Sequence, residues 1–336
     1  MKVLITAPFS ESGLTILKEA GLEVDHRSWL ETGKLYLGGK ILNVINEGGY
    51  DIVVVEGDEV KEEVIGGTNL KVIASVRNSP NNISVPAATA KGIPVLAAPG
   101  RNTIAVAELT IALILSQARR IIRAERLLKN DFMVDDFSDF GKMYKMTTGF
   151  ELQGKTVGII GLGQIGIEVA KRLNAFGVNL LVTDPYVASE RLEEVGARAV
   201  ELEELLRESD IVSIHCPQTE ETIGMLGAEQ FAVMKKTAIF INTARASITD
   251  EAALKVALET GVIAGAGLDV FSMEPVDCDN EFLELDNVTV TPHIGGNTID
   301  TVEKQSLMIA EDIKAILSGG RPKNILNPEV LNGGGS

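Results

Sequence analysis

The chain has 336 residues, a length that predicts about two domains, and a hydrophobic content of 45% that is ordinary for a protein with buried cores. Its formal net charge of −16, from 31 basic and 47 acidic residues, argues against nucleic acid or an anionic membrane as a partner. Two cysteines, Cys216 and Cys278, are too few for a disulfide framework. The sequence also has no signal-peptide pattern and no apolar stretch of transmembrane length. These features and the low cysteine count together predict a cytoplasmic protein.

Two series of alternating strand-like and helix-like patterns run along the chain. In the first, short apolar runs lie at residues 3–6, 51–55, 71–76 and 94–97, with a helical pattern at 12–20. In the second, strand-like runs lie at 156–160, 180–183, 197–200, 211–215, 238–241, 265–268 and 288–290, with helical patterns at 167–176, 202–207 and 251–259. Alternation of this kind predicts an α/β protein with two doubly wound parallel sheets.

A long apolar segment connects the two series. Pro99-Gly100 ends the first series, and Thr103 is placed to cap a helix over about residues 104–129. The apolar stripe of this helix predicts packing on the second domain or on another subunit, and consists of Ile104, Ala107, Ile111 and Leu115. Its arginines have helical spacing and predict a solvated or ion-paired face: Arg119, Arg120, Arg123 and Arg126.

The segment from Val157 to Asp184 has the order strand, glycine turn, helix, strand, acid. Gly161 permits a tight turn, Gly163 lets the backbone approach a pyrophosphate, and Gly166 lets the helix pack closely on the strand. The free N–H groups of the following helix N-terminus favour phosphate. The acid lies 18 residues after Gly166 and can accept hydrogen bonds from both ribose hydroxyls. The segment therefore predicts a dinucleotide site that prefers NAD to NADP.

The domain organisation follows from the two series and the last helical pattern, at residues 300–317. The first series has too few helices to cover its sheet, so we expect this last helix to return to it. We predict a discontinuous, flavodoxin-like substrate domain over residues 1–100 and 297–332. A Rossmann NAD domain, residues 101–296, is inserted into it, and residues 333–336 read as a linker or tag remnant.

Polar residues follow three strands of the second series. His293 follows the run 288–290 in a loop with Pro292, Gly295 and Gly296, Arg245 follows 238–241, and Asp269 and Glu274 follow 265–268. The carboxyl ends of parallel strands share one edge, so we expect these residues to converge there. Arginine can bind a carboxylate through two hydrogen bonds, and histidine can exchange a proton near neutral pH. Glutamate can hydrogen-bond the second ring nitrogen of that histidine. Each of these residues alone also fits a purely structural role: a hinge histidine, a helix-capping arginine or a solvated loop acid.

The three histidines and two cysteines lack metal-ligand spacing, so we expect no metal site.

The motifs resemble the D-isomer-specific 2-hydroxyacid dehydrogenase family, and the resemblance covers essentially residues 1–330. It is carried by the glycine turn, Asn242-Thr243-Ala244-Arg245, Gly267-Leu268-Asp269-Val270-Phe271 with Glu274-Pro275, and Thr291-Pro292-His293-Ile294-Gly295-Gly296. The resemblance implies reversible hydride transfer between NAD(H) and a 2-hydroxy or 2-keto acid, D-specificity and a homodimer. Overall the chain resembles phosphoglycerate dehydrogenases, and we expect it to be without the regulatory domain that many of them append.

The resemblance also implies roles for individual residues. Arg245 would bind the substrate carboxylate and carbonyl, His293 would donate the proton to the keto acid, and Glu274 would be its partner. Asp269 would bind the nicotinamide carboxamide. The remaining cofactor contacts would come from Gln164, Ile165, Pro217, Thr243, Ala244, Gly295 and Gly296, besides the turn glycines and Asp184.

The sequence departs from the family pattern at two places. Ala246 stands where a glycine usually follows the catalytic arginine, which puts the geometry of the carboxylate site in question. The substrate loop carries Arg77, Asn78 and Ser79 where most relatives have a glycine-rich stretch. Acids at residues 56–59 would repel a phosphate, so we favour a neutral-tailed or polyhydroxy keto acid, with Glu56, Asp58 or Arg77 reading its hydroxyls.

Other functions remain open on this fold. An NAD-sensing, corepressor-like binding protein would retain similar site residues. Phosphoglycerate, phosphite or formate oxidation would keep the enzyme class and change the substrate; formate enzymes place glutamine where Glu274 stands.

Overall fold

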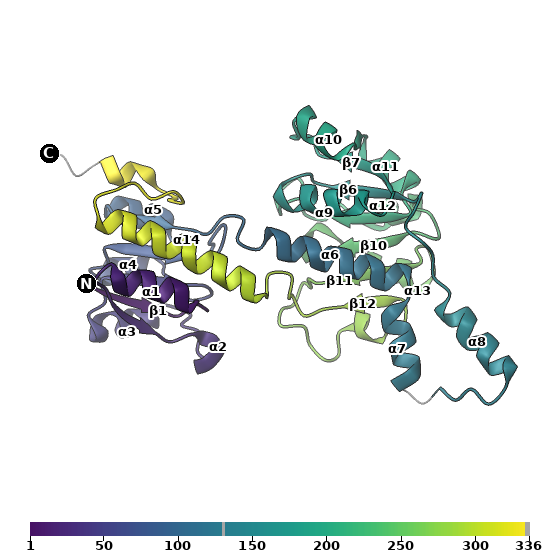
Figure 1. Cartoon of the computed structure of the whole chain (residues 1–336), viewed down its shortest axis with the longest axis horizontal. Coiled ribbons are helices and arrows are strands. Elements are labelled where there is room, and N and C mark those ends of the chain that lie inside the picture. Colours follow the sequence, from purple (N-terminus) through teal and green to yellow (C-terminus); the bar gives the residue numbers. More distant parts are fainter. Residues whose placement is uncertain (130–131, 333–336) are drawn as a thin grey trace. The chain divides into compact units, whose positions relative to one another are not determined.

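The computed structural model describes residues 1–129 and 132–332, and the chain forms two compact units (Figure 1). Unit 1 comprises Met1–Arg101 and the chain from Asn297 onward, and unit 2 comprises Asn102–Gly296. Residues 333–336, which read as a linker remnant, lie outside the described residues.

Unit 1 is built on a five-stranded parallel sheet in the order β2-β1-β3-β4-β5. The strands are β1 (Lys2–Ile5), β2 (Glu23–His26), β3 (Ile52–Val55), β4 (Val72–Ser75) and β5 (Val95–Leu96). This order is that of flavodoxin-like domains, as expected. The edge strand β2 was not predicted from the sequence, because its residues Glu-Val-Asp-His lack an apolar run and none of them is buried.

Helices cover both faces of the unit 1 sheet. On one face lie α1 (Glu11–Glu19) and α14 (Ile299–Leu317), which run side by side (Figure 1). The other face packs on α3 (Ile41–Gly48), α4 (Glu62–Gly67) and α5 (Val85–Ala90), and the short α2 (Trp29–Thr32) follows β2. The helical pattern expected at 300–317 is α14, and its Ile309, Ala310 and Ile313 are fully buried in the same cluster as strands β1 and β3.

Unit 2 is a seven-stranded parallel sheet in the order β12-β11-β10-β9-β6-β7-β8, the Rossmann arrangement. Its strands are β6 (Thr156–Ile160), β7 (Asn179–Thr183), β8 (Arg198–Ala199), β9 (Ile211–Ile214), β10 (Ile239–Asn242), β11 (Gly265–Leu268) and β12 (Val288–Val290). Its helices include α9 (Gln164–Asn174), α10 (Ser189–Val195), α11 (Leu202–Glu208), α12 (Ala228–Val233) and α13 (Glu251–Glu259), with short 3-10 turns at Ala246–Ile248 and Glu281–Glu284. The predicted fold class, two doubly wound parallel sheets, is confirmed.

The single helix expected over 104–129 is two helices, α6 (Thr103–Ala118) and α7 (Ile121–Lys129). The break lies at Arg120, whose φ of 52° is in the left-handed region and cannot continue a helix. The prediction that Thr103 caps the helix is also wrong, because the N-cap residue is Asn102 and its side chain makes no capping bond. A further helix, α8 (Phe137–Thr147), was not predicted.

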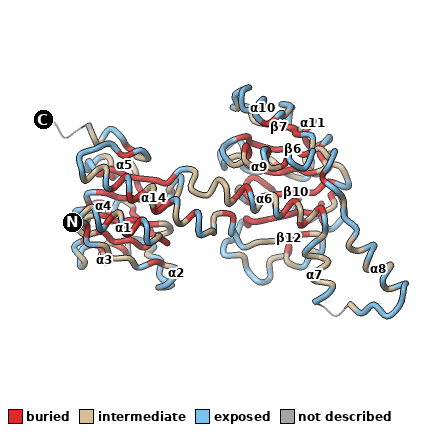
Figure 2. The backbone as a smooth tube through the Cα atoms, viewed as in Figure 1, coloured by how far each residue is buried: buried red, intermediate tan, exposed pale blue. Residues whose placement is uncertain are grey.

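Burial separates the core of unit 2 from α7 and α8. Strands β9, β10 and β11 are buried along their whole length and α6 has seven buried residues, whereas neither α7 nor α8 contains a buried residue (Figure 2). α6 packs against α9 and against β10 and β11. No helix within the described residues is long and apolar enough to cross a membrane.

Candidate active site

Three neighbouring strands of unit 2, β10, β11 and β12, end at one edge of the sheet, and the polar residues expected to converge follow these ends. Arg245 comes after β10, Asp269 and Glu274 after β11, and His293 after β12. The strands β12 and β10 are two strand spacings apart, so the strand ends that precede His293 and Arg245 lie roughly 10 Å from one another. A small molecule at this edge can therefore lie between their side chains.

His293 and Glu274 form a pair at this edge. The Nδ1 atom of His293 lies 2.6 Å from Oε2 of Glu274, and Oε1 of Glu274 accepts a hydrogen bond of 3.1 Å from the backbone N–H of Phe271. One oxygen of the Glu274 carboxylate is thus held by the backbone, and the other oxygen contacts Nδ1 of the His293 ring. The imidazole is 45% exposed, which leaves its Nε2 side open for proton exchange.

The loop that carries His293 is hydrogen-bonded to the buried carboxylate of Asp269. This carboxylate is 1% exposed, and it accepts hydrogen bonds from Thr291 Oγ1 at 2.6 Å and from the backbone N–H groups of Ile294 and Gly295, both at 2.8 Å. His293 itself has a φ of 55°, an unusual conformation for a residue other than glycine. The three hydrogen bonds that the loop donates to this one buried carboxylate explain how the loop keeps this conformation.

The loop of Arg245 is held by two polar contacts that the sequence did not reveal. The side chain of Asn242 accepts from the N–H of Ala244 and donates to the carbonyl of Arg245, both at 3.0 Å. The hydroxyls of Thr110, on α6, and Thr243 lie 2.9 Å apart and are buried. An asparagine that ends a strand before a loop is the signal that would have predicted the first contact.

Arg245 is exposed, and its NH1 group donates to the carbonyl of Ala244 at 2.6 Å. No carboxylate pairs with this guanidinium among residues 1–129 and 132–332, so its other N–H groups can face a ligand. Ala246, which replaces the usual glycine, begins a 3-10 turn and is not in the left-handed region. The backbone therefore does not require glycine at this position.

The glycine turn meets the geometric demands of a pyrophosphate site. A Cβ on Gly161 would lie 2.6 Å from the backbone N of Cys216, and one on Gly166 would lie 2.2 Å from the carbonyl oxygen of Gly161. A Cβ on Gly163, in contrast, would meet nothing within 4 Å, so the backbone there is open to a ligand. Gly163 is also the N-cap of α9 and provides no side-chain cap, which leaves the first N–H groups, including those of Gln164 and Ile165, for phosphate oxygens.

Asp184 directly follows β7, beside the glycine turn. Its Oδ2 accepts from the N–H of Leu162 at 2.8 Å, and its Oδ1 accepts from the N–H of Tyr186 at 2.9 Å. These bonds fix the carboxylate and leave lone pairs for further donors. The geometry fits a ribose diol next to a pyrophosphate on the turn.

The segment after β9 lies next to the turn. Burial lowers the pKa of His215 to about 3, so its imidazole is neutral at physiological pH, and Nε2 lies 2.8 Å from Ser213 Oγ. Burial also raises the pKa of the Cys216 thiol to about 11, which makes it a poor nucleophile. Pro217 is exposed beside them.

The substrate loop predicted from the sequence follows β4 in unit 1. Its Asn78 and Ser79 are exposed, and Arg77 donates from NH1 to Oδ1 of Asn81 at 3.3 Å. The backbone N–H of Arg77 also donates to Ser75 Oγ at 3.1 Å. The loop thus carries polar side chains at the carboxyl edge of its own sheet.

The acids near this loop are not placed as the sequence suggested. Asp58 is fully buried, with its oxygens bonded to Thr6 Oγ1 at 2.6 Å and to the N–H of Tyr36 at 2.8 Å, so the hypothesis that it reads substrate hydroxyls is wrong. Glu56 forms an ion pair of 2.8 Å with Arg101 and accepts from Trp29 Nε1 at 3.0 Å. Asp58 is buried and Glu56 is paired, so two of the three acids at residues 56–59 present no free carboxylate to a phosphate.

Comparison with known proteins identifies the family of the chain. Residues 111–295 match the family described as D-isomer specific 2-hydroxyacid dehydrogenase, NAD binding domain. A D-3-phosphoglycerate dehydrogenase of Archaeoglobus fulgidus is 42% identical over 97% of this chain. The chain belongs to the D-isomer-specific 2-hydroxyacid dehydrogenase family. It therefore carries that family's NAD-binding domain, and the open backbone at Gly163 fits that cofactor.

Relatives in this family differ in the activity for which they are named and in length. The chain spans 59% of the length of the Archaeoglobus dehydrogenase. A glyoxylate reductase of Thermofilum pendens is 38% identical, and the match covers 98% of this chain and 95% of the relative. A solved structure of a Thermus thermophilus protein matches with a TM-score of 0.86 and 34% identity, covering 97% of this chain and all of that one.

Proposed function

We propose that this member of the 2-hydroxyacid dehydrogenase family catalyses reversible hydride transfer between NAD(H) and a 2-hydroxy or 2-keto acid, with D-specificity. The observation that carries this proposal is the 2.6 Å contact between His293 Nδ1 and Glu274 at the carboxyl edge of the NAD-binding sheet. The nicotinamide, when bound, gives or takes the hydride. The chain's own residues bind the acid, orient it and move the proton.

His293 is the proposed acid and base. In keto-acid reduction its Nε2–H donates a proton to the carbonyl oxygen, and in the reverse direction Nε2 takes the hydroxyl proton. Glu274 holds the opposite nitrogen, selects this tautomer and stabilises the protonated ring, as the acid of a catalytic triad does. The bond from Phe271 N–H keeps the carboxylate in place during both steps.

Arg245 is the proposed carboxylate anchor. Its guanidinium has a planar fork that matches a carboxylate, and it is exposed at the same edge as His293. The Asn242 side chain and the Thr110–Thr243 contact hold its loop, so the group is positioned before substrate binds. Asp269 would hold the His293 loop, and we keep the proposal that it also faces the nicotinamide carboxamide.

The proposed cofactor contacts lie along the turn and the adjoining strand ends. The backbone of Gly161, Gly163 and Gly166 and the N–H groups of Gln164 and Ile165 would receive the pyrophosphate. Asp184 would accept from the ribose hydroxyls and repel a 2′-phosphate. The remaining contacts would be made by Pro217, Thr243, Ala244, Gly295 and Gly296.

In unit 1, we propose that Arg77, Asn78 and Ser79 contact the tail of the acid. A neutral-tailed or polyhydroxy acid remains the first candidate, since the loop offers amide and hydroxyl groups. The phosphorylated acid named for the Archaeoglobus relative is the second, because that relative is 42% identical, Asp58 is buried and Glu56 is paired with Arg101. Arg77 could contribute to either.

We further propose a cytoplasmic homodimer. α8 and the segment before it expose large apolar side chains, with Phe137 at 92%, Met133 at 69% and Tyr144 at 65%. Apolar surface of this kind is usually covered by a partner. Sedimentation velocity of the whole chain measures the state directly.

The activity is tested with a panel of 2-keto acids and NADH, followed by the loss of absorbance, with NADPH in parallel. The panel covers pyruvate, glyoxylate, hydroxypyruvate, 3-phosphohydroxypyruvate, branched and aromatic keto acids, and sugar-derived polyhydroxy keto acids. Turnover of one group identifies the tail that unit 1 accepts. If no acid is reduced while NADH still binds, the proposed activity is wrong and a sensing role gains weight.

A further inference from the structure

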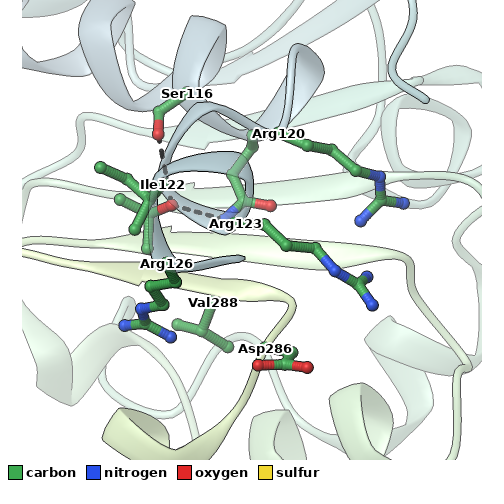
Figure 3. Close-up of a pocket in the computed structure, with 9 residues that line it drawn as sticks. Ser116, Arg120, Ile122, Arg123, Arg126, Asp286 and Val288 are labelled. Atoms are coloured by element: carbon green, nitrogen blue, oxygen red, sulfur yellow. Dashed lines mark hydrogen bonds between the residues drawn. The ribbon is translucent and has the colours of Figure 1, made fainter. Parts of the chain in front are cut away.

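A polar pocket lies in unit 2, where α6 ends and α7 begins. The empty space between its walls is about 250 Å³, part of which is open solvent, and the walls include Arg120, Arg123 and Arg126 (Figure 3). Its far wall is the start of β12, with Asp286 just before that strand. This is the amino end of the strand whose carboxyl end leads to His293, so the pocket is separate from the candidate active site.

The charges of this pocket are not balanced. Three arginines and one carboxylate, that of Asp286, line the pocket, which leaves a formal charge of +3 − 1 = +2 in a chain of net charge −16. Within the described residues, none of the three arginines forms an ion pair. Arginines elsewhere do: Arg27, Arg101, Arg172, Arg198 and Arg207 each lie 2.5 to 2.8 Å from a carboxylate.

Arg123 has a buried donor without a hydrogen-bond partner in the described part of the chain, and Arg120 is repelled by the like charge of Arg123. The Nε atom of Arg123 is buried and has no hydrogen-bond partner among the described residues. Burial and the charge of Arg123 together hold the pKa of Arg120 below its usual range. A buried donor without a partner costs about 1–3 kcal/mol. An oxyanion would satisfy the donor and offset the repulsion.

The arginines are also held in position. The backbone of Arg120 is in the left-handed region, and its Nε donates to the carbonyl of Thr148 at 3.1 Å. The N–H of Phe150 donates to the carbonyl of Ala118 at 2.8 Å, so the chain that returns from α8 is fastened to the end of α6. The side chains of Arg120 and Arg123 extend in the same direction from this junction (Figure 3).

We propose that this arginine pocket, formed by Arg120, Arg123 and Arg126, binds an oxyanionic group, a carboxylate or a phosphate. Forked donors in a partly buried setting are the side chains that proteins use for such groups. The group can come from a free small anion or from an acidic side chain of a second copy of the chain. The two sources are separated by experiment, and the binding does not depend on the activity proposed above.

The first arm titrates the chain with inorganic phosphate, and separately with citrate, by isothermal titration calorimetry. NADH is kept saturating so that the glycine turn is filled, and NaCl keeps the ionic strength constant. Arg123→Gln and Arg126→Gln remove one guanidinium each. Arg119→Gln is the matched control, because Arg119 is exposed, lies next to the pocket and does not line it. We expect saturable binding that is weakened about tenfold in both pocket variants and unchanged in the control.

The second arm measures self-association of the same variants by sedimentation velocity at low and high salt. If small anions do not bind, a dimer dissociation constant raised about tenfold in the pocket variants, but not in Arg119→Gln, supports a carboxylate of the second copy as the occupant. Phosphate binding that is equal in all variants would place the anion elsewhere and overturn the proposal. So would variants that match the control in both arms.

Discussion

The buried carboxylate of Asp269 accepts a hydrogen bond of 2.8 Å from the backbone N–H of Gly295, a residue 26 positions further along the chain. With its bonds to Thr291 and Ile294, Asp269 ties the end of β11 to the loop that presents His293. A Cβ on Gly295 would lie 2.9 Å from the same carboxylate, so the loop and the acid are fitted to each other.

Asp269→Asn should lower kcat and the melting temperature together. An asparagine has one acceptor oxygen, so backbone donors of the His293 loop would face an amide NH2 and lose their partners, at a cost of about 1–3 kcal/mol. Thr291→Val removes only one of the three bonds and should have a smaller effect on both. An Asp269→Asn variant with unchanged kcat and stability would contradict the holding role.

His293→Ala should lower kcat by about 10²- to 10⁴-fold, because the carbonyl oxygen loses its proton donor. NADH affinity, measured by fluorescence titration, should remain within a few-fold. Glu274→Gln keeps the size of the side chain and removes the charge beside Nδ1, so it should lower kcat less than His293→Ala. Unchanged turnover in His293→Ala would mean that another group moves the proton.

Two glycine variants separate a ligand site from a packing site. Gly163→Ala should fold normally, since its Cβ meets nothing within 4 Å, but should weaken NADH binding because the methyl group occupies the phosphate approach. Gly166→Ala should destabilise the fold by about 1–3 kcal/mol, because its Cβ would lie 2.2 Å from a backbone oxygen. Thermal melts and NADH titrations of both variants check this. Equal NADH affinity in Gly163→Ala and wild type would remove the turn from the cofactor site.

Asp184→Ala should raise the KM for NADH about tenfold or more, since the ribose loses a charged acceptor. The same change should lower the KM for NADPH, because the like charge beside a 2′-phosphate is removed. The ratio of kcat/KM for the two cofactors is the measurement. A preference for NADH that survives in Asp184→Ala would show that another residue selects the cofactor.

The stability of the protein should fall in mild acid through His215. Its folded pKa is about 3 and its ordinary pKa is about 6.5, so between these values the unfolded chain binds a proton that the folded chain does not. This contribution is therefore complete above about pH 6.5 and declines as the pH drops toward 3. The drop in melting temperature from pH 7 to pH 5 should be smaller in His215→Asn than in wild type, with His26→Asn as the control. An equal drop in all three would show that His215 does not govern the loss.

The dinucleotide turn and the polar residues of the sheet edge could be predicted from the sequence. The turn is one contiguous strand–turn–helix unit, so its glycines and Asp184 are recognisable from local spacing. The placement of Arg245, Glu274 and His293 after strands that end at one edge follows from a general rule, because parallel strands place their carboxyl ends together. Neither step needs knowledge of which side chains touch.

Contacts between distant segments were decided only by the tertiary structure. Asp58 and Asp184 are both acids that follow apolar strands, yet Asp58 is sealed by Thr6 and Tyr36 while Asp184 lies beside the open turn. At the helix break, the side chain of Arg120 likewise bonds to the carbonyl of Thr148, a residue 28 positions away that local spacing could not identify. Periodicity reports which face of an element is apolar. It does not report which remote group satisfies a buried charge, and that pairing separates a structural residue from one that can bind a ligand.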